Sequence, residues 1–148
     1  MNLNGYKFFK IGNIEFVLEN KKIKEFFPEN RYLKRKECLL HKYGASPFCG
    51  FKVNHKIKDN GVYCFKIENE IKYIGKSENL YKRIYAYGSI QPRNCYVGGQ
   101  QTNCRINKLI LREAKNNKKI ELFFMKTHNK DDIEEELIKK YNPEWNKR

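Results

Sequence analysis

Two short runs of β-branched and aromatic residues, 62–67 and 71–74, lie three residues apart in the chain. This pattern predicts two strands joined by a tight loop, which is an antiparallel hairpin. In the register that a three-residue loop sets, residue 67 faces residue 71 and residue 63 faces residue 75. Because side chains alternate between the two faces of a strand, we expect one face to carry Tyr63, Phe65, Ile71 and Tyr73.

A helix over residues 78–87 is predicted to follow, with Ser77 as its N-cap and Gly88 at its end. At about 3.6 residues per turn, its apolar stripe comprises Leu80, Ile84 and Tyr87. Arg83 lies at the edge of this stripe, one turn before Tyr87.

Later in the chain, the sequence predicts a polar loop over residues 88–104, a helix capped by Thr102, a strand over 120–125 and a helix over 131–141. The apolar residues of the last helix fall within about 140° of arc, and Glu134 lies inside that arc. A carboxylate that points the same way as the core needs a partner or a metal ion. Together these elements predict an α+β fold in which helices flank a small antiparallel three-stranded sheet.

Residues 1–60 are expected to form an N-terminal extension to a core at residues 61–148. In the extension, Gly12-Asn13 separates two strand-like runs and predicts a β-hairpin. The sequence of residues 31–43 favours a short basic helix.

The charge balance indicates a polyanionic partner. The chain has 31 Lys and Arg residues against 17 Asp and Glu residues, a formal net charge of +14 at pH 7. Neutralising phosphates releases counterions, so this cation excess favours nucleic acid, and after it an anionic membrane surface. A hydrophobic content of 40% excludes a disordered basic tail.

The sequence has no run of about 18 apolar residues and no secretory leader, so we expect a soluble cytoplasmic protein of bacterial type. Five cysteines are an odd number with no C-x-x-C pair, which argues against a disulfide framework. One set of possible zinc ligands stays open against ordinary buried or surface residues: Cys38, His41, Cys49 and His55.

Five sequence elements follow one another in a distinctive order. Nine residues separate Gly61-Val62-Tyr63 from Tyr73-Ile74-Gly75, Arg83 follows eight residues after that second glycine, and Glu134 and Asn146 lie near the end. In this order, and on these predicted strands, helices and terminus, the elements resemble the GIY-YIG nuclease family. The resemblance covers the chain from about Gly61 to Asn146. It implies a catalytic core at residues 61–148, to which the extension over residues 1–60 would contribute DNA recognition or dimer contacts.

The resemblance implies hydrolysis of DNA phosphodiester bonds with one divalent metal ion per active site. Glu134 would bind Mg²⁺ or Mn²⁺, with water completing most of the coordination. Tyr63 would orient or deprotonate the attacking water, and Arg83 would hold a phosphate oxygen. A free phenol has a pKa of about 10, so a nearby cation must assist Tyr63, and Lys76 is the candidate.

Three further residues take supporting roles in this interpretation. Tyr73 and Tyr87 would hydrogen-bond the phosphate or the nucleophile, and Asn146 would orient the helix that carries Glu134. Each residue of the set also has an ordinary structural alternative, because tyrosines can pack within a sheet and polar side chains can be surface groups.

Only two residues follow Asn146, so we expect sequence recognition to come from the extension, from the loop over residues 88–104 or from a second subunit. The loop and the helix after it offer side chains that suit base edges in the major groove: Arg93, Asn94, Gln100, Gln101, Asn103, Arg105 and Asn107. A solvated polar loop is the alternative.

A compact nuclease with such insertions resembles the type II restriction endonuclease branch of the family, which cuts double-stranded DNA at a specific sequence. One metal site cuts one strand, so we expect a homodimer on a palindromic site, with a cognate DNA methyltransferase encoded nearby. Two alternatives stay open: a nicking, repair or mobile-element nuclease of the same family with low sequence specificity, and a basic DNA-binding domain without catalysis.

Overall fold

A computed structural model describes residues 1–147 and divides the chain into two compact units. The first unit comprises Met1–Ile14, Val53–Ile84 and the described residues from Asn117 onward, and the second comprises Glu15–Lys52 and Tyr85–Asn116. Each unit is therefore assembled from separated stretches of chain. We expect residues 1–60 to serve recognition and residues 61–148 to serve catalysis. This functional division at residue 61 stays a prediction.

The first unit contains the strands β1 (Asn2–Leu3), β2 (Tyr6–Lys7), β9 (Gly61–Ile67), β10 (Glu70–Ser77) and β11 (Ile120–Lys126), the helix α3 (Lys130–Tyr141) and the 3-10 turn η3 (Glu144–Asn146). Three elements pass from one unit into the other: β3 (Phe9–Phe16), β8 (Phe51–Val53) and α1 (Leu80–Gly88).

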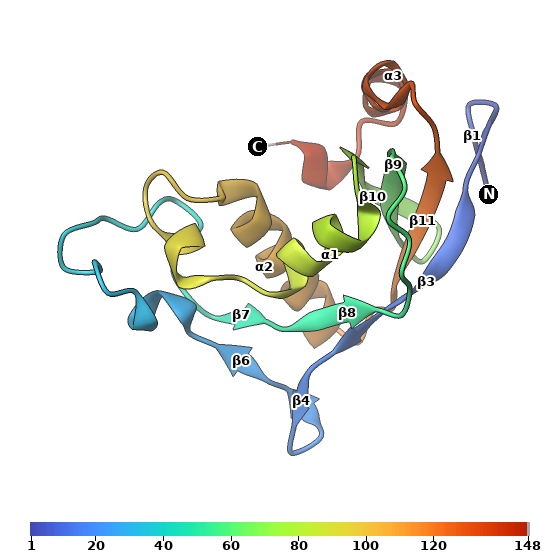
Figure 1. Cartoon of the computed structure of the whole chain (residues 1–148). Coiled ribbons are helices and arrows are strands. Elements are labelled where there is room, and N and C mark those ends of the chain that lie inside the picture. Colours follow the sequence, from blue (N-terminus) through green and yellow to red (C-terminus); the bar gives the residue numbers. More distant parts are fainter. Residues whose placement is uncertain (148) are drawn as a thin grey trace. The chain divides into compact units, whose positions relative to one another are not determined.

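The central sheet has five strands in the order β10-β9-β11-β3-β8 (Figure 1). The α+β class is confirmed, and the three predicted strands are the neighbours β10, β9 and β11. The expectation of only three strands is wrong, because β3 pairs antiparallel with the other edge of β11. An unpaired strand edge leaves a row of backbone N–H and C=O groups without hydrogen-bond partners, and β3 supplies these partners for β11.

The hairpin predicted at Gly12-Asn13 is wrong, because β3 runs through this dipeptide without a turn. Gly12 serves close packing instead: a Cβ atom there would lie 3.2 Å from Cγ1 of Val53. The first hairpin of the chain joins β1 to β2 through Asn4-Gly5, and both of these residues have positive φ. Asn-Gly is the strongest short hairpin signal, so the sequence carried this turn at a position we did not assign.

The hairpin of β9 and β10 has the predicted register from Tyr73, which lies opposite Phe65, to its open end, where Gly75 lies opposite Tyr63. Near its turn the loop has two residues rather than three, so Glu70 pairs with Ile67. A bulge immediately after Ile71 absorbs the extra residue. It turns Ile71 to the opposite face, against the hydrophobic core, so the prediction that Ile71 shares a face with Tyr63 is wrong.

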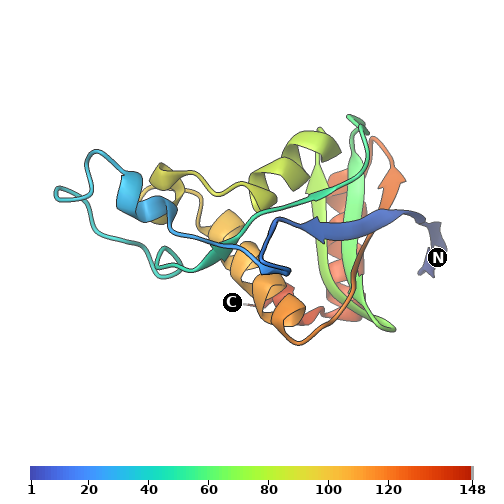
Figure 2. The same ribbon diagram turned by 90° about the horizontal axis from the view of Figure 1, so that it is seen from below.

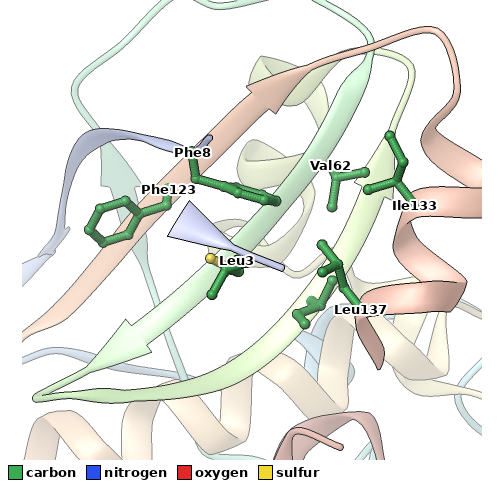
Figure 3. Packing of buried hydrophobic residues seen from close by; sticks show 8 residues of the cluster. Leu3, Phe8, Val62, Phe123, Ile133 and Leu137 are labelled. Atoms are coloured by element: carbon green, nitrogen blue, oxygen red, sulfur yellow. The ribbon is translucent and has the colours of Figure 1, made fainter. Parts of the chain in front are cut away.

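The core of the first unit lies between one face of the sheet and α3 (Figure 3). Ile133 and Leu137 of α3 pack with Val62 of β9, and Leu3 and Phe8 from the N-terminal stretch join the same cluster. Burying one such side chain contributes about 1.5–3 kcal/mol, so the cluster fixes α3 on the sheet.

The N-terminal hairpin also holds α3 through hydrogen bonds to Glu136. Nδ2 of Asn4 donates to one carboxylate oxygen at 2.8 Å, and Oη of Tyr6 donates to the other at 3.2 Å. Nζ of Lys140, one turn later on α3, donates to Oδ1 of Asn4 at 2.8 Å. Residues near the start of the chain therefore support the helix that carries Glu134.

The second unit contains β4 (Leu18–Glu19), β5 (Lys22–Ile23), β6 (Glu25–Phe26), β7 (Phe48–Cys49), the 3-10 turns η1 (Pro28–Arg31) and η2 (Pro92–Cys95), and the helix α2 (Gln101–Lys115). The basic helix predicted over residues 31–43 is wrong, because this segment forms turns. Leu33 is 94% exposed and Leu39 is 79% exposed, whereas Tyr32 and Cys38 pack against the core. The apolar residues therefore do not form the continuous buried face on which most helical stability depends.

The helix predicted over residues 78–87 is α1, and it begins two residues later than expected. Oδ1 of Asn79 accepts the Lys82 N–H at 3.0 Å, so Asn79 rather than Ser77 caps the helix. The predicted stripe is confirmed, because Leu80, Ile84 and Tyr87 are all buried. Across residues 1–147, no helix is long and apolar enough to cross a membrane.

Candidate active site

Three aromatic side chains form a layer on one face of the sheet. Along β9 they alternate with the core residues, which point to the opposite face. The ring centroids of Tyr63 and Tyr73 lie 6.2 Å apart, and Phe65 lies 5.9 Å from Tyr63 and 6.3 Å from Tyr73. The two phenols therefore share one surface, as the strand alternation predicts. Tyr63 is 1% exposed, so its orientation is fixed by packing.

Arg83 is the cation in contact with the Tyr63 phenol. Its Nε donates to Oη of Tyr63 at 3.4 Å, from the first turn of α1. The side chain is half-buried, as expected for the edge of the apolar stripe. A guanidinium at this distance stabilises negative charge on the phenol oxygen.

Gly75 makes the position of Tyr63 possible. A Cβ atom on Gly75 would lie 2.5 Å from both Oη and Cζ of Tyr63, which is closer than real Cβ contacts come. The Tyr63 ring therefore lies across β10 at a residue that has no side chain. The glycine of Tyr73-Ile74-Gly75 is thus required by the neighbouring strand rather than by a turn.

Glu134 lies near the start of α3, with 20% of its side chain exposed. Its carboxylate accepts a hydrogen bond from the backbone N–H of Lys76, and Oε1 lies 3.9 Å from Nζ of Lys76. Burial raises the pKa of Glu134, and the charge of Lys76 opposes this shift. The carboxylate is therefore an anion that its protein neighbours compensate incompletely.

Lys76 lies on the side of β10 that faces α3. Its Nζ forms an ion pair with Oδ1 of Asp131 at 2.8 Å, and this hydrogen bond raises the pKa of Lys76. Lys76 is therefore protonated at neutral pH and acts as a cation. Sequence reasoning missed Asp131, although its spacing of three residues from Glu134 places both carboxylates on one helix face.

The peptide group between Gly75 and Lys76 links the two halves of the site. The Tyr63 phenol lies against Gly75, and the Glu134 carboxylate binds the N–H of the next residue. Consecutive Cα atoms are about 3.8 Å apart, so the two side chains reach one short stretch of β10. The first unit thus brings the predicted Tyr63, Arg83 and Glu134 to this stretch.

Asn146 pairs with the edge strand of the sheet. Its Oδ1 accepts the Ile74 N–H at 2.9 Å, and its Nδ2 donates to the Ile74 carbonyl at 2.8 Å. Trp145 is 1% exposed, with its ring centroid 6.5 Å from that of Phe65. These contacts fix the segment after α3 to β10, which suits the positioning role that the resemblance implies.

The other predicted site residues belong to the second unit. Tyr87 is fully buried, and its role stays a prediction. Asn107 is also fully buried: its Oδ1 accepts the Cys49 N–H at 2.9 Å, and its Nδ2 donates to the carbonyls of Cys49 and Tyr87, both at 2.8 Å. Its amide is therefore occupied inside the protein, and no surface of Asn107 is presented to a base edge.

The remaining predicted DNA-contacting side chains differ in exposure. Asn103 and Arg105 are buried in α2. Oδ1 of Asn94 accepts the Gln91 N–H at 2.8 Å. The exposed members of the set are Arg93, Gln100 and Gln101.

The donor chemistry of the site fits one hard divalent cation. Glu134 offers carboxylate oxygens, and Mg²⁺ commonly takes one or two carboxylates and keeps several waters. Among residues 1–147, no three metal-ligating side chains gather at one point, and this includes the set considered for zinc. In that set, Nδ1 of His41 accepts the Tyr43 N–H at 3.0 Å, and Nε2 lies 2.5 Å from the Asn94 carbonyl oxygen.

No family model matches the chain, and no curated protein matches it. Among solved structures, the chain is similar to a mutant of bacteriophage T4 EndoII, with 26% sequence identity and a TM-score of 0.48. The similarity covers 74% of this chain and 85% of that chain. A TM-score below 0.5 does not establish a shared fold.

Proposed function

We propose that this protein is a GIY-YIG-type deoxyribonuclease that hydrolyses phosphodiester bonds of double-stranded DNA with one divalent metal ion. The supporting observation is the arrangement at Gly75 and Lys76: a buried phenol in contact with a guanidinium lies against Gly75, and a partly buried carboxylate lies beside Lys76. The formal net charge of +14 fits a DNA substrate.

The side chains of the site divide the chemistry among them. Arg83 stabilises Tyr63 as a phenolate, which orients the attacking water, accepts its proton and becomes a neutral phenol. A guanidinium has five N–H donors, so Arg83 can donate to Tyr63 and to a phosphate oxygen at once. Glu134 would hold Mg²⁺ or Mn²⁺, which when bound supplies positive charge to the phosphate oxygens.

The supporting residues act on position and charge. Tyr73 hydrogen-bonds the phosphate or the nucleophile. The same role for Tyr87 requires its hydroxyl to become accessible when DNA binds, because this residue is fully buried. Lys76 stays protonated beside Asp131, so it contributes positive charge next to Glu134 rather than a base. Asn146 positions the end of the chain against β10 and thereby α3.

The finer proposal is a type II restriction enzyme that works as a homodimer, with a cognate methyltransferase encoded nearby. It is supported by the exposed Arg93, Gln100 and Gln101, which have donors and acceptors that suit base edges. Cutting both strands of a palindromic site with one metal site per chain requires two chains.

The experiment that tests the catalytic proposal is cleavage of plasmid DNA in Mg²⁺ by the wild type, Glu134→Ala and Glu135→Ala. Glu135 is an exposed neighbour on the same helix and serves as the matched control. We expect Glu134→Ala to abolish cutting while DNA binding is retained, and Glu135→Ala to cut within about twofold of the wild type, as surface substitutions usually do. Cutting by Glu134→Ala would contradict the assignment of the metal ligand.

Incubation with phage DNA tests the restriction proposal separately. Discrete bands are expected from a sequence-specific enzyme. A smear, or nicked circles from supercoiled plasmid, would instead support a nicking, repair or mobile-element nuclease of low specificity. Binding without any cutting in Mg²⁺ or Mn²⁺ would leave only a basic DNA-binding domain.

A further inference from the structure

Residues 31–42 of the second unit form an exposed, strongly basic segment, here called the basic arm (Figure 2). It carries five lysines and arginines against one acidic residue, Glu37. All five cations are exposed. Leu33 is 94% exposed and Leu39 is 79% exposed, so the arm combines apolar side chains in solvent with positive charge.

Both ends of the basic arm are fixed to the unit. Near its start, the ring of Tyr32 lies 4.7 Å from that of Tyr96, whose Oη donates to the Glu29 carbonyl at 2.8 Å. Near its end, the His41 N–H donates to the Cys95 carbonyl at 3.1 Å. The exposed middle is therefore presented from a fixed base and is not a loose tail.

The base of the arm belongs to the loop that carries the exposed DNA-contacting candidates. Leu39 accepts a hydrogen bond from the Val97 N–H at 2.8 Å, and Leu40 forms a β-bridge with Tyr96. Arg93 precedes these loop residues, and Gln100 follows them. The arm and the loop thus adjoin one another within the second unit.

The shape of the arm favours the minor groove of DNA. The major groove, about 12 Å wide, accepts a helix or a two-stranded ribbon, and the arm is neither. The minor groove is about 6 Å wide, and proteins enter it with basic segments that often insert an apolar side chain between base steps. An exposed leucine followed by three consecutive cations, Lys34, Arg35 and Lys36, matches this requirement.

We propose that the basic arm is a minor-groove DNA-binding element in which Leu33 inserts between two base pairs and the adjacent cations hold the flanking phosphates. The proposal rests on the proposed function only in taking DNA as the partner. Opening a base step costs free energy, which the additional protein–DNA contacts offset. The arm thereby distorts DNA at the surface where Arg93 and Gln100 would read base edges.

Unwinding of plasmid DNA tests this role without knowledge of a recognition sequence. A closed plasmid is relaxed by a metal-independent topoisomerase in EDTA, with the full-length protein bound and unable to cut. Insertion of a side chain unwinds the bound DNA during relaxation. After the proteins are removed, the plasmid therefore retains supercoils that measure this unwinding. We expect a shift in the topoisomers with the wild type and loss of that shift with Leu33→Ala.

Two variants separate insertion from charge. Leu18→Ala removes another exposed leucine, 59% exposed in β4, and should keep the topoisomer shift. The double change Lys34→Ala and Lys36→Ala removes two phosphate contacts. It should lower the slope of log affinity against log salt by about 1.8, whereas Leu33→Ala should leave this slope unchanged.

An unchanged topoisomer shift with Leu33→Ala would overturn the proposal, as would the absence of a shift with bound wild type. If Leu33→Ala alters self-association in sedimentation and leaves the topoisomers unchanged, the arm is a contact between protein chains and the proposal is wrong. A wild type that cuts DNA in Mg²⁺ without unwinding it contradicts the insertion and keeps the proposed function. A wild type that neither binds nor cuts DNA removes both.

Discussion

In the first unit, Tyr63 and Glu134 are buried wholly or in part, and both side chains reach the peptide between Gly75 and Lys76. In the second unit, Asn107 is buried, and its side chain forms three hydrogen bonds with backbone groups of Cys49 and Tyr87. The surroundings of Glu134 compensate its charge incompletely, whereas both polar atoms of the Asn107 side chain have hydrogen-bond partners. A partly compensated polar group is a candidate for chemistry, and a fully satisfied one is a candidate for stability.

The largest effect is expected from Arg83→Ala, which tests whether the first unit is catalytic. Losing a fixed cation that stabilises transition-state charge costs about 10²–10³-fold in rate. Cleavage should therefore fall by about that factor in single-turnover assays, with the melting temperature little changed. Lys82→Ala removes an exposed neighbour on the same helix and should keep the wild-type rate. A loss below about tenfold would show that the contact with Tyr63 is only structural.

Asn107→Ala should lower the stability of the second unit rather than alter DNA specificity. The change removes three hydrogen bonds and leaves buried backbone groups unpaired, at about 1–3 kcal/mol for each such group. We expect the free energy of unfolding to fall by about 3 kcal/mol and the melting temperature by roughly 6–12 °C. Calorimetry measures both. A normal melting temperature together with a changed cleavage pattern would make Asn107 a base-reading residue after all.

Arg93→Ala and Gln100→Ala should show the opposite behaviour within the same unit. Both residues are exposed, so the free energy of unfolding should change by less than about 0.5 kcal/mol. Each good contact to a base edge is worth about 1–3 kcal/mol of discrimination. The ratio of cleavage rates on the preferred site and on a site with one changed base pair should fall accordingly. An unchanged ratio would indicate a solvated loop.

The smallest effect is expected from Glu134→Gln in EDTA, measured as stability against pH. Burial raises the pKa of Glu134 above its ordinary value of 4.5, so the folded state holds the proton more tightly than the unfolded state. Ionising Glu134 therefore costs folding free energy as the pH rises from 4.5 through the folded pKa. Glu134→Gln should melt at a higher temperature than the wild type at pH 7, because it removes the ionisation that burial opposes. The difference should vanish below pH 4.5, and a lower melting temperature at pH 7 would reverse the assignment.

The sequence predicted β9, β10, β11, α1, α3 and the shared face of Tyr63 and Tyr73 because these depend on local periodicity. It did not predict the bulge after Ile71 or the pairing of β3 with β11, which depend on turn length and on contacts between distant residues. For the candidate site, the order of the motif residues along the chain predicted that Arg83 would lie near the sheet. The ion pair of Lys76 with Asp131 could not be derived from strand alternation, since it joins β10 to α3.

The exposure of the polar loop was equally outside the reach of sequence. Asn103, Arg105 and Asn107 are polar like Gln100 and Gln101, but they lie in the part of α2 where consecutive side chains are buried. Only the packing of that helix separates a base-reading residue from a structural one.

Both units are built from interrupted stretches of chain, and this has a consequence for how the proposed nuclease could acquire a new target sequence. A contiguous fragment cannot be cut out and replaced as a recognition module, because β3, β8 and α1 each run through both units. Removing residues 1–60 would take β3 from the sheet and the β1–β2 hairpin from α3. New specificity would therefore arise by substitutions and length changes in exposed loops, one position at a time, while the interleaved scaffold is inherited whole.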